Sequence, residues 1–248
     1  MSMARQSRPT VLLTRPAEAS ERFAAELRAR FGPVDVVVSP LMVPEFRAPV
    51  LPDAWDGVIL TSETGARALA RLTARRGPAI CVGPRTAEVA QALGWQAEAV
   101  GGDAESLVAA LAARGLAGRW LHARGQDAAG DLAARLNAAG ADIAEAVVYA
   151  QVAQPLSAAA QAALAGAAPV VAAVFSPRSA RLLAAEAGAL LRAPLAVAAI
   201  SAAAAAPVQA LAGAGLAVAP TPDAAGMLAA LGRVLGKDGG AAAAQVYS

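Results

Sequence analysis

The stretch GVILTSETGARALARL, residues 57–72, joins a short apolar run to a segment in which alanine and leucine recur at helical spacing. A similar stretch, AAVFSPRSARLLAAEA, occupies residues 172–187. In each, a serine (Ser62 or Ser176) stands where the run gives way to the helical segment, a position at which serine commonly caps a helix. The sequence therefore predicts a strand followed by a helix, and it predicts this unit twice.

The repeat continues toward the C-terminus from both stretches. AICVGPRTAEVAQALG at 79–94 resembles AVAAISAAAAAPVQALAG at 196–213, and AESLVAAL at 104–111 resembles AAGMLAAL at 224–231. The partners lie too far apart along the chain for a solenoid repeat, and their separation suits duplicated domains. Many apolar runs carry no polar residue on either face, as strands do when helices cover both sides of a parallel sheet. We therefore predict an α/β protein with two similar doubly wound lobes, each built on a parallel sheet.

Two segments interrupt the strand–helix alternation and indicate where the lobes join. SPLMVPEFRAPVLPD, residues 39–53, is too rich in proline for a helix, and VVYAQVAQP, residues 147–155, is a long extended run. We expect both to connect the same two lobes. The predicted organisation is lobe one at 1–37 and 155–248, lobe two at 50–146, and interdomain linkers at 38–49 and 147–154. The tail after about residue 236, which contains Tyr247, is predicted to be disordered.

Composition excludes several classes of protein. The formal net charge is only +2, which argues against nucleic acid as a partner. The N-terminal apolar run is too short for a signal peptide, and the long uncharged stretches are broken by Pro, Gln and Ser, so we expect a cytoplasmic protein without membrane segments. One cysteine, Cys81, and one histidine, His122, form no recognisable metal site.

Small, hydroxyl-bearing or basic residues follow the predicted strands. In doubly wound sheets ligands bind beyond the carboxyl ends of the strands, and helix starts there offer free backbone N–H groups to anions. The same residues are also ordinary helix caps, but their number favours a large anionic ligand in the cleft between the lobes. The candidate ligand-binding residues are Arg15, Ser62, Gly83, Thr86, Arg124, Gly125, Ser176, Ser179 and Ser201.

Familiar catalytic motifs are missing from the sequence. No dinucleotide fingerprint, phosphate-binding loop or nucleophile elbow is present. We expect His122 to be a structural residue within a strand and Cys81 to be a small buried side chain rather than a thiolate. The chain therefore carries little chemical equipment of its own.

The ordered set VLLTRP, SPLMVPEF, GVILTSETGARAL, AICVGPRTAEVAQALG, AEAVVYAQV, VFSPRSARLL and PTPDAAGMLAAL resembles the uroporphyrinogen-III synthase family over residues 10–235. The resemblance implies two flavodoxin-like lobes joined by a two-stranded extended linker. It also implies a reaction without a cofactor: linear hydroxymethylbilane loses its hydroxyl and closes to a macrocycle with ring D inverted. A monomer is expected, with the linear tetrapyrrole as its small-molecule partner.

Tyr149, in AEAVVYAQV, matches the tyrosine that this family places in its cleft, and the resemblance gives it the role of assisting the departing hydroxyl. The alternative for Tyr149 is a strand tyrosine that covers the border of its lobe. The family pattern Gly-x-x-Thr is present at Gly83 and Thr86, but the second repeat has Ser201 and Ala204. This departure leaves open a non-catalytic or regulatory tetrapyrrole-binding paralogue. A sugar- or nucleotide-processing enzyme of similar shape is a third alternative.

Overall fold

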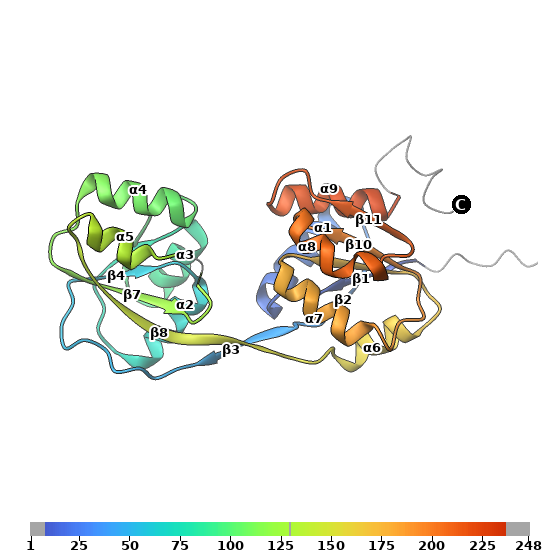
Figure 1. Ribbon diagram of the computed structural model, residues 1–248, viewed down its shortest axis with the longest axis horizontal. Coiled ribbons are helices and arrows are strands. Elements are labelled where there is room, and N and C mark those ends of the chain that lie inside the picture. The colour runs from blue at the N-terminus through green and yellow to red at the C-terminus, as the bar shows by residue number, and fades with distance from the viewer. Residues whose placement is uncertain (1–7, 129, 237–248) are drawn as a thin grey trace, which may run out of the picture. The chain divides into compact units, whose positions relative to one another are not determined.

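Two separate β-sheets organise the chain, each with helices on both faces (Figure 1). The computed structural model describes residues 8–128 and 130–236. Its contacts divide the chain into two units: unit 1 combines the residues up to Val43 with those from Ala153 onward, and unit 2 is Pro44–Val152. The predicted disordered tail, with Tyr247, lies outside the described residues.

Unit 1 contains a five-stranded sheet in the order β11-β10-β9-β1-β2, and its strand pairs are all parallel. Helices α1 and α9 cover one face, and α6, α7 and a short 3-10 helix cover the other. The elements of this unit are β1 (Thr10–Leu13), α1 (Ala17–Phe31), β2 (Asp35–Val38), α6 (Ala158–Ala165), β9 (Val170–Val174), α7 (Pro177–Ala187), β10 (Leu195–Ala199), α8 (Ala202–Ala205), η1 (Ala206–Leu211), β11 (Gly215–Val218) and α9 (Ala224–Val234).

Unit 2 contains a six-stranded sheet in the order β3-β8-β7-β4-β5-β6. Helices α2 and α3 cover one face, and α4 and α5 cover the other. The elements are β3 (Met42–Phe46), β4 (Gly57–Leu60), α2 (Glu63–Leu72), β5 (Pro78–Cys81), α3 (Pro84–Ala92), β6 (Gln96–Ala99), α4 (Ala104–Arg114), β7 (Arg119–Gly125), α5 (Leu132–Ala138) and β8 (Asp142–Ala153).

The internal repeat corresponds to a shared strand order. Matching residues 57–72 with 172–187 pairs β4 with β9, and the following repeats pair β5 with β10 and β6 with β11. The neighbours then match as well, because β7 and β8 lie beside β4 as β1 and β2 lie beside β9. The two units therefore have the same spatial order of five strands but begin it at different strands.

The strands β3 and β8 pair at the places where the chain passes from one unit to the other. Within unit 1, Gln154 donates its backbone N–H to the carbonyl of Leu41 at 2.8 Å, and within unit 2 Arg47 donates to Val148 at 2.9 Å. Since the residue numbers run in opposite senses, the two strands are antiparallel. The edge strand β3 is thus the exception to the parallel pairing of this sheet.

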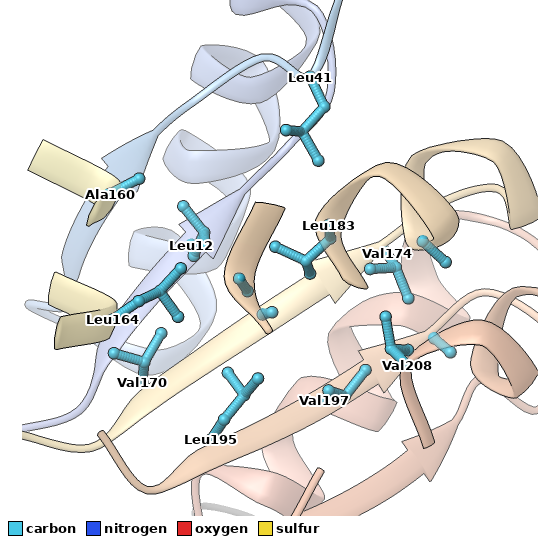
Figure 2. Packing of buried hydrophobic residues seen from close by; sticks show 14 of the residues in the cluster. Leu12, Leu41, Ala160, Leu164, Val170, Val174, Leu183, Leu195, Val197 and Val208 are labelled. Carbon is cyan, nitrogen blue, oxygen red and sulfur yellow. The ribbon is translucent and has the colours of Figure 1, made fainter. Parts of the chain in front are cut away.

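Aliphatic and alanine side chains fill the space between each sheet and its helices. Because strand side chains alternate between faces, Leu12 lies in one cluster of unit 1 while Val11 and Leu13 lie in the other. Figure 2 shows the first cluster, where Val174 and Val197 from neighbouring strands pack with Leu183 of α7. Complete burial of such side chains contributes about 1.5–3 kcal/mol each, so these clusters supply much of the stability of the unit.

Some helix ends differ from those that the sequence predicted. We expected a helix over 65–75, but α2 ends at Leu72, and Thr73 adopts an extended conformation. We also expected one over 128–138, but α5 begins only at Leu132. Both errors have the same cause, since alanine and arginine favour helix at exposed positions without specifying where tertiary packing stops it.

Candidate functional site

A serine and a tyrosine meet at the carboxyl edge of the sheet in unit 2. Ser62 is the N-cap of α2, and its Oγ accepts the backbone N–H of Gly65 at 2.9 Å. The same Oγ lies 3.1 Å from the hydroxyl of Tyr149, which comes from β8. The amide at the start of α2, the serine and the phenol therefore form one hydrogen-bonded series.

Gly125 leaves the space that the ring of Tyr149 occupies. A β-carbon at position 125 would lie 2.6 Å from Cζ of Tyr149, closer than real contacts allow. The pairing of β7 with β8 shifts at this point, because Arg124 is opposite Val147 whereas Gly125 is opposite Tyr149. Such a bulge redirects side chains, and here it sets the phenol over a glycine. We predicted Gly125 as a ligand-binding residue, and its observed contact is with the tyrosine.

Arg124 belongs to a second polar series on the neighbouring strands. Its Nε lies 2.9 Å from Oε1 of Glu145, although the N–H is not aligned for a hydrogen bond. The same carboxylate oxygen lies 3.2 Å from Nδ1 of His122, and Nε2 of that ring lies 3.4 Å from the hydroxyl of Thr61. Burial lowers the pKa of His122 below its usual value of 6.5, and the neighbouring Glu145 carboxylate partly opposes this shift. The imidazole is therefore neutral at pH 7.

Gly83 and Thr86 lie at the start of α3, after the strand next to β4. Gly83 is the N-cap of α3, and a β-carbon there would meet no atom within 4 Å. Thr86 is buried in the first turn of the same helix. The two residues stand at the same sheet edge as Ser62, since β4 and β5 are paired in parallel.

In unit 1 the candidate residues lie at the corresponding edge of the other sheet. Ser176 caps α7 by accepting the N–H of Ser179 at 3.1 Å, and the two hydroxyls lie 2.9 Å apart. The guanidinium of Arg15 lies 4.3 Å from the centre of the Phe175 ring. Ser201 caps α8 by accepting the N–H of Ala204 at 3.3 Å. Each of these residues has a structural contact, and for the serines it is the capping role that was the alternative to ligand binding.

Other reactive groups are poorly placed for chemistry. Cys81 is fully buried, and burial raises the pKa of its thiol to about 11, so the thiol stays protonated, as we predicted for a small buried side chain. Within residues 8–128 and 130–236, no group of three or more His, Cys, Asp or Glu side chains could hold a metal ion. None of the helices in these residues is both long enough and apolar enough to cross a membrane.

Sequence reasoning found most of these residues but missed one partner. His122 is buried within β7, as predicted for a structural residue. Glu145, which contacts both His122 and Arg124, was not among the candidates. The available signal was a carboxylate inside the alternating apolar run DIAEAVVYA, a place where an ionisable side chain usually has a partner.

Comparison with known proteins agrees with this picture. The family model described as uroporphyrinogen-III synthase HemD matches residues 21–229. Among solved structures, uroporphyrinogen-III synthetase from Helicobacter pylori gives a TM-score of 0.58 at 17% identity, covering 89% of this chain and 97% of that chain. A mutant uroporphyrinogen III synthase from the bacterium Thermus thermophilus gives a TM-score of 0.45 at 16% identity, covering 93% and 100%. A search of curated proteins finds no match.

At such low identity the solved structures bear on the fold alone, and the Helicobacter protein supports an α/β fold with parallel sheets. The family model carries more weight, because it spans most of the chain, including Ser62, Arg124 and Tyr149. It supports a catalytic role in tetrapyrrole biosynthesis. The chain belongs to the uroporphyrinogen-III synthase family.

Proposed function

We propose that this protein is a cyclising hydro-lyase that converts hydroxymethylbilane to uroporphyrinogen III, with inversion of ring D and loss of water. Family membership supports the reaction. The observation that carries the assignment to this site is the hydrogen bond between Ser62 and Tyr149 at the start of α2. It connects a helix N-terminus to a phenol, a group suited to protonate or hydrogen-bond a departing hydroxyl.

The direction of this hydrogen-bonded series follows from the inventory of donors. The amide of Gly65 donates to Ser62, which leaves the serine proton available for the phenol oxygen of Tyr149. When the serine donates, the phenol proton is available for the substrate hydroxyl. A chain of donors polarised from the helix start strengthens each bond, so the phenol becomes a better donor. We assign Tyr149 this role.

The atoms balance without a further reactant. The hydroxyl leaves with one proton as water, and the substituted carbon of ring D is attacked to give a spiro intermediate. Rearrangement and closure release a proton from the carbon skeleton, so the net change is the loss of one water. A redox partner is not needed for this balance, which agrees with the expectation that the family uses no cofactor.

Binding and positioning account for the rest of the proposed mechanism. The substrate is a flexible polycarboxylate, and unaided closure gives the isomer without inversion, so the enzyme must hold one geometry. We propose that Arg15 and Arg124 bind carboxylates, since guanidinium groups suit them. The N-terminal amides of α2, α3 and α7 add further donors. The proposed substrate-binding set is Arg15, Ser62, Gly83, Thr86, Arg124, Gly125, Ser176, Ser179 and Ser201.

The same proposal covers the finer organisation of the chain. The strand order β2-β1-β9-β10-β11 follows the flavodoxin-like pattern 2-1-3-4-5, and β8-β7-β4-β5-β6 follows it after permutation. We propose two flavodoxin-like lobes joined by a two-stranded linker, in which β3 and β8 take part. A cytoplasmic monomer is part of the proposal.

The test couples the purified protein to enzymatic production of hydroxymethylbilane and separates the product isomers. We expect uroporphyrinogen III as the main product. Type I isomer alone, formed at the rate measured without protein, would contradict the proposed function.

One observation favours a second candidate, a non-catalytic tetrapyrrole-binding paralogue. Ala204 is fully buried at the position that matches Thr86, so α8 presents no hydroxyl there. Tight binding of a tetrapyrrole without turnover would favour the paralogue over the enzyme.

A further inference from the structure

A histidine and a glutamate stand opposite each other in the sheet of unit 2. His122 on β7 is in register with Glu145 on β8, and their side chains approach to 3.2 Å between Nδ1 and Oε1. The histidine is 3% exposed, whereas the glutamate side chain is 36% exposed. The pair therefore runs from the interior of the unit to its surface. A buried imidazole needs such a partner, since an unpaired polar group is costly to bury.

The fold itself does not require a polar pair at these positions. The repeat places Ser176 on Ser62 and hence Ala173 on Ile59. The strand neighbours of Ala173 and Ile59 are Leu13 and His122, respectively. The next strand contributes Val38 opposite Leu13, where unit 2 has Glu145 opposite His122. Unit 1 thus builds the same part of its sheet with leucine and valine.

The glutamate also contacts the arginine at the end of β7. Oε1 of Glu145 lies 2.9 Å from Nε of Arg124, while Nη1 of that arginine donates to the carbonyl of Gly125 at 3.2 Å. Among the described residues, Nη2 makes no hydrogen bond. The guanidinium is therefore held on one side and presents Nη2 on the other.

The matching arginine of unit 1 has a different support. Arg15 follows Leu13 as Arg124 follows His122, but the residue on the neighbouring strand is Val38, which has no carboxylate. Its guanidinium instead lies over the Phe175 ring, 4.3 Å from the ring centre. Two equivalent arginines are thus placed by different means, and only the one in unit 2 is tied to a buried histidine.

We propose that His122 and Glu145 are positioning residues, which hold the guanidinium of Arg124 in the orientation that binds a carboxylate of the substrate. This inference rests on the proposed function for its ligand, a linear polycarboxylate. His122 fixes the carboxylate of Glu145, and Glu145 fixes Nε of Arg124. The hydroxyl of Thr61, 3.4 Å from Nε2, completes the support of the ring.

Stability alone is a weak reason for this arrangement. A partly exposed ion pair contributes little to the free energy of unfolding. A buried polar network, moreover, is often no more stable than an apolar replacement of similar volume. Unit 1 provides that replacement in Leu13 and Val38, both accommodated in the same fold. A role in binding explains why unit 2 differs.

The first test is a double-mutant cycle on the full-length protein, with KM and kcat for hydroxymethylbilane as readouts. We expect Arg124→Gln to raise KM about tenfold and Glu145→Gln to raise it about fivefold, with kcat changed less than about twofold. If Glu145 acts through Arg124, the double variant has the KM of Arg124→Gln alone. Additive effects would show that the glutamate does not act through the arginine, and would overturn the proposal.

The same two strands offer a matched control. Asp142 on β8 lies 3.0 Å from Nε of Arg119 on β7, an exposed pair at the opposite end of the strands. We expect Asp142→Asn to leave KM unchanged. An equal rise of KM in Asp142→Asn and Glu145→Gln would mean that any lost ion pair between β7 and β8 has this effect, and would contradict the proposal.

The second test transfers the apolar pair of unit 1 into unit 2 as His122→Leu with Glu145→Val. Because both polar groups are removed together, no buried partner is left unpaired. We expect the melting temperature to stay within a few degrees of that of the original protein while KM rises as in Glu145→Gln. An unchanged KM in this folded variant would return His122 and Glu145 to a structural role.

A binding assay separates failure of this inference from failure of the proposed function. Uroporphyrin, an octacarboxylate, serves as the probe, and quenching of tryptophan fluorescence gives its Kd for each variant. If the unaltered protein makes only type I isomer, the proposed function fails, but the order of Kd values still decides the inference. Weaker binding in Glu145→Gln, not additive with Arg124→Gln, supports it, and equal Kd values overturn it.

Discussion

The two units share a strand order and a set of helix caps, and they differ in the side chains at one edge of the sheet. Ser62 and Ser176 cap matching helices, as do Asp103 and Asp223, each carboxylate accepting a backbone N–H at 2.7 Å. These shared features are needed to start helices after strands. The residues that differ must have another reason to be present.

The differences are concentrated in β7 and β8. Unit 2 has His122, Glu145 and the bulge that sets Tyr149 over Gly125, whereas unit 1 pairs Leu13 with Val38 in a continuous register. The comparison separates what the fold demands from what unit 2 adds. The additions are the residues to which we assign proton donation and carboxylate binding.

The largest expected effect is that of Tyr149→Phe. Loss of the hydroxyl should lower kcat about 100-fold or more, within the range for loss of a general acid. The ring keeps its place over Gly125, so far-UV circular dichroism and the melting temperature should not change. An unaltered kcat would return Tyr149 to a packing role and erase the main functional difference between the units.

A glycine substitution tests whether the position of the phenol matters as well as its presence. Gly125→Ala places a β-carbon against Tyr149, and displacement of the ring should lower kcat about tenfold. Gly83→Ala is the matched control, because its β-carbon meets no atom within 4 Å. Similar kinetics for both alanine variants would contradict the contact between position 125 and the ring.

The paired caps test which part of the serine series is particular to unit 2. Ser62→Ala and Ser176→Ala should each lower the free energy of unfolding by about 1 kcal/mol, since each removes a helix N-cap. Ser62→Ala should also lower kcat severalfold, because Ser62 contacts Tyr149, and Ser176→Ala should change kcat less. Equal changes in kcat would remove the distinction between the two serines.

The smallest effect concerns pH. Burial lowers the pKa of His122 below 6.5, so the unfolded chain binds the proton more readily than the folded one. The free energy of unfolding should therefore fall as the pH drops below about 6.5. The variant His122→Leu with Glu145→Val should lose this part of the pH dependence, which urea titrations at several pH values can measure. Parallel curves for the two proteins would contradict a buried, neutral histidine.

The sequence alone predicted the α/β class, the repeated unit and the serine caps, because these follow from local periodicity and from the residues that start helices. It did not predict the contact between Glu145 and Arg124 or the bulge at Gly125. Both depend on how β7 and β8 align, and the alternation of apolar residues does not define that register to the residue. The end of α2 at Leu72 was missed for a related reason, since packing rather than propensity stops that helix.

The most direct test of the account is the isomer ratio formed by the unaltered protein and by Tyr149→Phe from the same supply of hydroxymethylbilane. We expect type III from the unaltered protein. With the phenylalanine variant, spontaneous closure should outpace the enzyme and give mainly type I. Mainly type III at an undiminished rate from Tyr149→Phe would contradict the assignment of the proton donor to unit 2.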